Sequence, residues 1–119
     1  MDFIDYQAAA LRTALFETQV DGLVHASLGL ITETGEFVSE VKRMAKYGKA
    51  ITPEMHAHMC EEIGDVMWYV ALAAEHLGVS MKSLAKQNIA KLQKRFPDKF
   101  SNEAAEARAD KGGLPHTVS

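Results

Sequence analysis

Residues 52–77, with the sequence TPEMHAHMCEEIGDVMWYVALAAEHL, decide the fold expected for this chain. Thr52 can cap a helix, Pro53 is favoured at a first helical position, and Glu54 suits the positive end of the helix dipole. The apolar residues that follow recur at a helical spacing, so a helix is expected up to about Gly78. Its inner face is predicted to contain Met59, Ile63, Val66, Val70, Ala74 and Leu77.

The same helical spacing continues on both sides of this stretch. We expect a first helix over residues 2–17 and a long second helix over residues 21–47 that stops at Gly48. A fourth helix is expected over residues 81–95, and Pro97 should end it. The chain is therefore predicted to be all-α, with a central antiparallel helical hairpin.

Composition and length narrow the class of protein. The 119 residues suit one domain, and 47% hydrophobic and 24% charged residues are typical of a globular protein. We expect a helical domain over residues 1–100 and a poorly ordered tail over residues 101–119. A net charge of −3 gives no general affinity for nucleic acid, and the single cysteine, Cys60, excludes an intrachain disulfide. Without a signal-like start or a long apolar run, the protein is expected to be cytoplasmic and to bind no membrane.

Two pairs of acids share one spacing. Glu33 and Glu36 are expected about 80° and 140° from the apolar centre of the second helix, and Glu62 and Asp65 have the same offsets on the third. A short turn makes the two helices antiparallel, so equal offsets fall on one side of the pair. The levels are symmetric about position 49, so that Glu36 should face Glu62 and Glu33 should face Asp65. These four residues are called the acid cluster below.

Four carboxylates gathered beside an apolar core would repel one another and lose hydration unless a cation were bound among them. Oxygen donors favour Mg²⁺, with Mn²⁺ as a possible substitute. One alternative stays open at this point: a non-enzymatic helical oligomerisation module, in which the acids serve only solubility. That reading does not account for the matched spacing.

The motifs Glu33-Thr34-Gly35-Glu36 and Glu62-Ile63-Gly64-Asp65 resemble those of the MazG-like all-α nucleotide pyrophosphohydrolases, which have ExxE followed by ExxD. The resemblance extends over most of residues 20–100. It implies a four-helix MazG-like bundle that holds Mg²⁺ on the acid cluster. The implied reaction cleaves a ribo- or deoxyribonucleoside triphosphate between its α and β phosphates, giving a monophosphate and pyrophosphate, for sanitation or remodelling of the nucleotide pool. Dimeric dUTP hydrolases and phosphoribosyl-ATP pyrophosphohydrolases have a similar architecture and remain alternatives.

Further residues are candidates for catalysis and substrate binding. Glu61 is the preferred general base, Glu36 is assigned to catalysis as well as to the metal, and Glu40 could support the ligands, hold another ion or act as the base. Tyr69 could contact the nucleotide or simply pack at the edge of the core. Three residues on the fourth helix form a stripe that could bind phosphate or be a solvated basic edge: Asn88, Lys91 and Arg95.

The five histidines include no His pair at i, i+4 and no Glu-x-x-His, which argues against zinc or di-iron, and no catalytic role is assigned to them. Trp68 is expected about 160° from the apolar centre of its helix, where a subunit interface is a better explanation than stacking on a base. A small hairpin of this kind would gain from association. We therefore expect a homo-oligomer, either a dimer or, as we favour, a tetramer.

Overall fold

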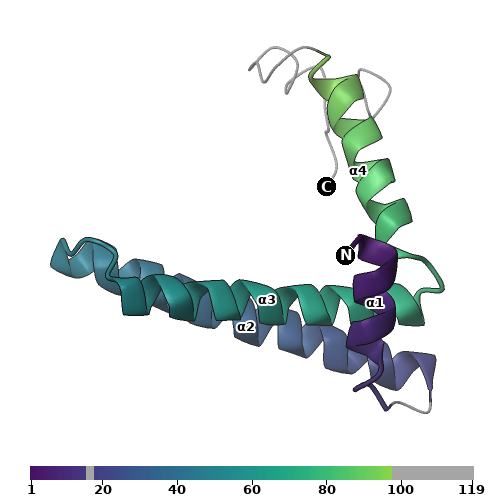
Figure 1. The fold of residues 1–119 in the computed structure, drawn as a ribbon, viewed down its shortest axis with the longest axis horizontal. Coiled ribbons are helices and arrows are strands. Elements are labelled where there is room, and N and C mark those ends of the chain that lie inside the picture. The colour runs from purple at the N-terminus through teal and green to yellow at the C-terminus, as the bar shows by residue number, and fades with distance from the viewer. Residues whose placement is uncertain (16–17, 98–119) are drawn as a thin grey trace, which may run out of the picture. The chain divides into compact units, whose positions relative to one another are not determined.

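The computed structural model describes residues 1–15 and 18–97, and all regular structure in these residues is helical. The elements are α1 (Phe3–Leu11), α2 (Gln19–Tyr47), α3 (Pro53–His76) and α4 (Met81–Arg95) (Figure 1). The all-α prediction is confirmed, and the predicted bounds of the second, third and fourth helices hold to within two residues. None of the described helices combines the length and the apolar character that crossing a membrane would require.

The ends of α2 and α3 follow from local capping. The Thr18 side chain accepts a hydrogen bond from the backbone of Asp21 at 3.1 Å, and Gly48 ends α2 in the left-handed conformation with φ at 60°. The Thr52 side chain accepts from the backbone of Met55 at 3.1 Å and thereby caps α3, as predicted. A short turn therefore joins two long antiparallel helices.

Helix α1 is shorter than the predicted span of residues 2–17. Asp2 caps its start by accepting from the backbone of Asp5 at 2.8 Å, but the helix ends at Leu11. The backbone amides of Arg12 and Thr13 donate to carbonyls three residues back, so the chain tightens into a turn. The Thr13 hydroxyl also donates to the Ala10 carbonyl at 2.9 Å, which satisfies the helix end.

Two close approaches fix the register of α2 against α3. A Cβ atom on Gly29 would overlap the ring of Tyr69, and one on Gly22 would overlap the ring of His76. The two members of each pair are equally far in sequence from position 49. The contacts therefore confirm the register inferred from the acid spacing, and they explain why α2 has glycine at these helical positions despite its low helix propensity.

The buried core of the described chain is small. Its fully buried apolar residues are Ala26 on α2 and Ala71, Leu72 and Ala74 on α3. Gln7 on α1 is also buried: its amide donates to the Val79 carbonyl at 3.2 Å and its Oε1 accepts from the Met81 backbone at 2.8 Å. One α1 side chain thus ties that helix to the segment that follows α3.

Trp68 has a partner within its own chain. Its indole Nε1 donates to the Ala10 carbonyl and to the Thr13 hydroxyl, both at 3.0 Å. These bonds join α3 to α1 and to the turn that follows it, a contact that the sequence reasoning did not foresee. The unusual angular position of Trp68 is explained by this packing. The expectation that Trp68 lies in a subunit interface stays a prediction.

The chain divides into two compact units, residues 1–81 and residues 82–119. The first holds α1 and the hairpin of α2 and α3, and the second holds α4 beyond its first residue. Packing of all four helices into one bundle stays a prediction. The proposed tail, residues 101–119, lies outside the described residues.

Candidate metal site

The acid cluster lies in the middle of the hairpin. Glu33 and Glu36 are on α2, and Glu62 and Asp65 are on α3. Glu33 is half-buried, Glu36 and Asp65 are exposed, and Glu62 is only 4% exposed. The four side chains therefore differ in exposure, since Glu62 is buried whereas Glu36 and Asp65 are open to solvent.

The pKa of the Glu33 carboxyl depends on the other three members of the acid cluster. Partial desolvation raises the pKa of the Glu33 carboxyl above its ordinary value, and the negative charge of Glu36 and then that of Asp65 raise it further. A side-chain hydrogen bond that protonated Glu33 donates to Glu36 raises this pKa as well, and so does the charge of Glu62. The charges of all three other members thus raise the pKa of the Glu33 carboxyl. Their roles as metal ligands stay a prediction.

Glu62 is the buried anchor of the cluster. One oxygen, Oε1, lies 2.9 Å from Nδ1 of His58, whereas Oε2 is buried and has no hydrogen-bond partner. A buried carboxylate oxygen without a donor is costly, by about 1–3 kcal/mol. No Lys or Arg in the described part of the chain forms an ion pair with any member of the acid cluster. The donor set and its unpaired oxygen fit a bound cation.

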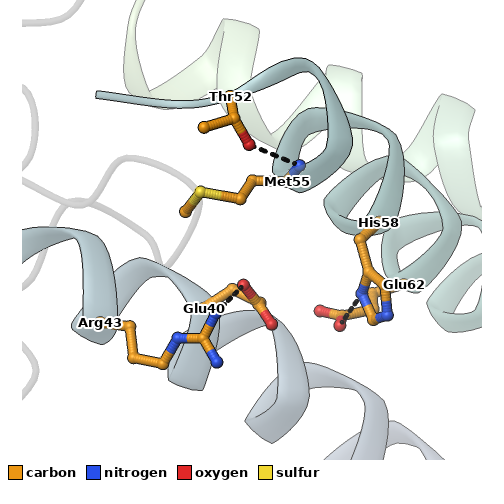
Figure 2. A network of polar contacts seen from close by, with 6 residues as sticks. All are labelled: Glu40, Arg43, Thr52, Met55, His58 and Glu62. Carbon is orange, nitrogen blue, oxygen red and sulfur yellow. Dashed lines mark hydrogen bonds and ion pairs between the residues drawn. The ribbon is translucent and has the colours of Figure 1, made fainter. Parts of the chain in front are cut away.

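His58 was missed by the sequence reasoning. Figure 2 shows it on α3 with its ring directed at Glu62, across from Glu40 on α2, and the donor atoms of the three residues lie within 4.8 Å of one another. The signal was present, because His58 lies one turn before Glu62 on the same face. The search for His pairs and for Glu-x-x-His did not include a histidine that precedes its acid by four residues.

Tyr6 on α1 is a second residue that the sequence reasoning missed. Burial raises the pKa of its hydroxyl, and the charge of Asp65 raises it further, so the tyrosine lies near the exposed end of the acid cluster. A contact between α1 and α3 joins segments far apart in sequence. No spacing rule within one helix could have revealed it.

Tyr69 packs between the two hairpin helices. Its ring contacts Gly29, meets the Trp68 ring edge-on at 5.0 Å, and lies 5.7 Å from the His25 ring. Of the alternatives considered above, packing at the edge of the core accounts for these contacts. Its predicted contact with the nucleotide is untested.

The remaining predicted site residues are on α3 and α4. Glu61 is exposed on α3 next to Glu62. The stripe of Asn88, Lys91 and Arg95 is on α4, in the second unit. The Arg95 guanidinium lies 6.0 Å from the centre of the Phe96 ring. Phosphate binding by this stripe stays a prediction.

Comparisons with known proteins identify the family. The model of the MazG nucleotide pyrophosphohydrolase domain matches residues 25–100, which include both acid pairs and the turn between them. The Gene 37 protein of Mycobacterium phage L5 is 36% identical over 96 residues, covering 76% of this chain and 84% of the relative. No solved structure matches the chain. The chain belongs to the MazG nucleotide pyrophosphohydrolase family.

Proposed function

We propose that this protein hydrolyses a nucleoside triphosphate between its α and β phosphates and releases a nucleoside monophosphate and pyrophosphate. The observation that supports this most is the acid cluster, in which a buried carboxylate oxygen of Glu62 has no partner in a chain of a pyrophosphohydrolase family. The carboxylates of this cluster would repel a negatively charged triphosphate unless cations were bound between them and the substrate. The reaction is proposed to require Mg²⁺.

The acid cluster would hold Mg²⁺ through carboxylate oxygens, the donors that this ion prefers. When bound, the ion supplies neutralisation of the phosphate oxygens and a more acidic water. The exposed ends at Glu36 and Asp65 face the solvent from which substrate arrives, and the buried Glu62 keeps one ligand fixed.

The side chains of this protein supply the other parts of the reaction. Glu61 is exposed beside Glu62 and is proposed to accept the proton of the attacking water. The cationic stripe on α4, Lys91 and Arg95 with Asn88, is proposed to bind phosphate oxygens. Tyr69 packs beside the rings of Trp68 and His25 and is proposed to border the nucleotide.

A homo-oligomer, dimer or tetramer, is also proposed. The hairpin exposes large apolar residues along α2, with Val24 at 51%, Ile31 at 74% and Val38 at 54% exposure. They are spaced by seven residues, so they lie on one stripe of the helix. A second copy of the chain would bury this stripe. Sedimentation velocity should show an assembly that Ile31→Lys weakens, and a monomeric wild-type protein at all concentrations would contradict this part of the proposal.

The function is tested by incubating the full chain with each ribo- and deoxyribonucleoside triphosphate and Mg²⁺, then separating the products. Pyrophosphate and the monophosphate are expected in equal amounts. Glu36→Gln and Asp65→Asn should abolish turnover with the helical circular dichroism signal retained, since they remove ligand charge without removing packing. Glu54→Gln, an exposed acid in the first turn of α3, is the control. Release of orthophosphate without pyrophosphate would contradict the proposal. Absence of metal binding would also contradict it and would favour the alternative of a non-enzymatic oligomerisation module.

A further inference from the structure

A second group of potential metal ligands lies on the turn side of the acid cluster. It comprises Glu40 from α2 and His58 and Glu62 from α3, and one donor atom from each lies within 4.8 Å of the others (Figure 2). Glu40 and His58 are equally far in sequence from position 49, so the register set by Gly29 and Tyr69 also places them opposite each other. The group is therefore a product of the hairpin and not of one flexible side chain.

The distances within the group suit a coordination sphere. Donor atoms at about 2.1 Å from a common ion lie roughly 3–4 Å from one another. His58 Nδ1 and Glu62 Oε1 are 2.9 Å apart, and all three donor atoms lie within 4.8 Å of one another. A small movement of the His58 or the Glu40 side chain would bring these atoms to the separation expected around one ion.

The charge of Glu62, the buried member of the group, is not balanced by an arginine or lysine in the described part of the chain. Glu62 is 96% buried, and its Oε2 has no partner. Arg43 approaches Glu40 at 3.7 Å but is an exposed residue of the same helix and does not reach Glu62. The His58 ring offers Glu62 a positive charge only when protonated. A cation bound to this trio would supply the missing positive charge.

We propose that Glu40, His58 and Glu62 form a second cation position that takes a transition-metal ion such as Mn²⁺ in preference to Mg²⁺, with Glu62 shared between this position and the acid cluster. The imidazole nitrogen decides the preference, because Mg²⁺ favours oxygen ligands whereas transition-metal ions accept nitrogen. The protein thus has an all-oxygen position and a mixed nitrogen and oxygen position side by side. The inference shares Glu62 with the proposed function but does not require the proposed reaction.

The test uses the full-length protein after removal of metal with a chelator. Mn²⁺ is added, and pulsed electron paramagnetic resonance is used to detect coupling between the ion and a directly bound nitrogen. Coupling is expected in the wild-type protein, and its pattern should change when the histidines are labelled with ¹⁵N. Mn²⁺ and Mg²⁺ affinities are measured by calorimetry on the same samples.

His58→Ala should abolish the nitrogen coupling and weaken Mn²⁺ binding at one position at least tenfold, with Mg²⁺ affinity changed by less than about twofold. His56→Ala is the matched control, because His56 is an exposed histidine two residues away whose contact is with Cys60 at 3.8 Å. It should leave both measurements unchanged. Glu40→Gln should weaken Mn²⁺ binding as His58→Ala does.

The opposite results would overturn the proposal. If His58 only orients Glu62 through a hydrogen bond, wild-type protein shows no nitrogen coupling, and His58→Ala affects Mg²⁺ and Mn²⁺ equally. Loss of coupling in His56→Ala would place the nitrogen elsewhere. Absence of pyrophosphate release with Mg²⁺ would contradict the proposed function alone, since the spectroscopic result is obtained without nucleotide.

Discussion

Replacement of Gly29 by alanine tests whether close contact between α2 and α3 sets the geometry of the acid cluster. Gly29 lies one turn before Glu33, and Tyr69 lies one turn after Asp65, so their contact is at the next level of the hairpin. A new Cβ would overlap the Tyr69 ring and force it or the helices to move. Gly35→Ala, also within α2, is the matched control because a Cβ there meets no atom within 4 Å.

The expected magnitudes separate the two variants. Each gains about 1 kcal/mol from the higher helix propensity of alanine. Gly29→Ala alone also incurs an overpacking cost of about 1–3 kcal/mol. Gly35→Ala should therefore stabilise the chain by about 1 kcal/mol, and Gly29→Ala should fall below it by about 1–3 kcal/mol, or roughly 4–12 °C in melting temperature.

Thermal unfolding followed by circular dichroism in excess chelator measures this difference without any contribution from metal. Mg²⁺ titrations of the same samples should then show weaker binding in Gly29→Ala, although no carboxylate has been changed. Equal melting temperatures for the two alanine variants would refute the reasoning, because they would mean that the Tyr69 ring yields without cost and does not fix the spacing of the helices.

Two further predictions follow from the site and from α1. A raised pKa of Glu33 means that the folded chain holds this proton more tightly than the unfolded chain, so its contribution to stability is present at low pH and is lost as pH rises through the folded pKa. In metal-free protein, the stability of Glu33→Gln relative to wild type should increase as pH rises above 4.5, the ordinary pKa of this carboxyl. Thermal melts of both proteins from pH 4 to 7 would measure this, and a stability difference that does not change with pH would contradict it. Trp68→Phe removes the hydrogen bonds to Ala10 and Thr13, and it should lower the free energy of unfolding in urea by about 1–3 kcal/mol. Amide hydrogen exchange in α1 should become faster. Unchanged exchange would show that other contacts hold α1.

The hairpin could be predicted because its determinants are local. Thr52, Pro53 and Gly48 act within one turn of the residues they cap, and a short connection leaves only an antiparallel arrangement. The positions of the acids then follow from helix geometry alone. The register is confirmed by the Gly29 contact with Tyr69, in which neither residue belongs to the motifs.

The parts that were missed depend on α1, for which the sequence offers no comparable constraint. The packing of Trp68 on Ala10 and the nearness of Tyr6 to Asp65 both require knowledge of where α1 lies against α3. Without that knowledge, an aromatic residue far from the apolar centre of its helix is reasonably assigned to another subunit. Tertiary contacts between distant segments decide such cases, and spacing within one helix does not contain them.

His58 shows a different kind of limit, because its relation to Glu62 is local and was available in the sequence. What the sequence lacked was the burial of Glu62 at 4% exposure, which turns an ordinary His and Glu pair into one that leaves a carboxylate oxygen unpaired. The acid cluster is thus bounded on one side by the close approach at Gly29 and on the other by Glu40 and His58. Since all these pairs share one register, a change that shifted α2 along α3 would disturb the apolar contact and both groups of ligands together.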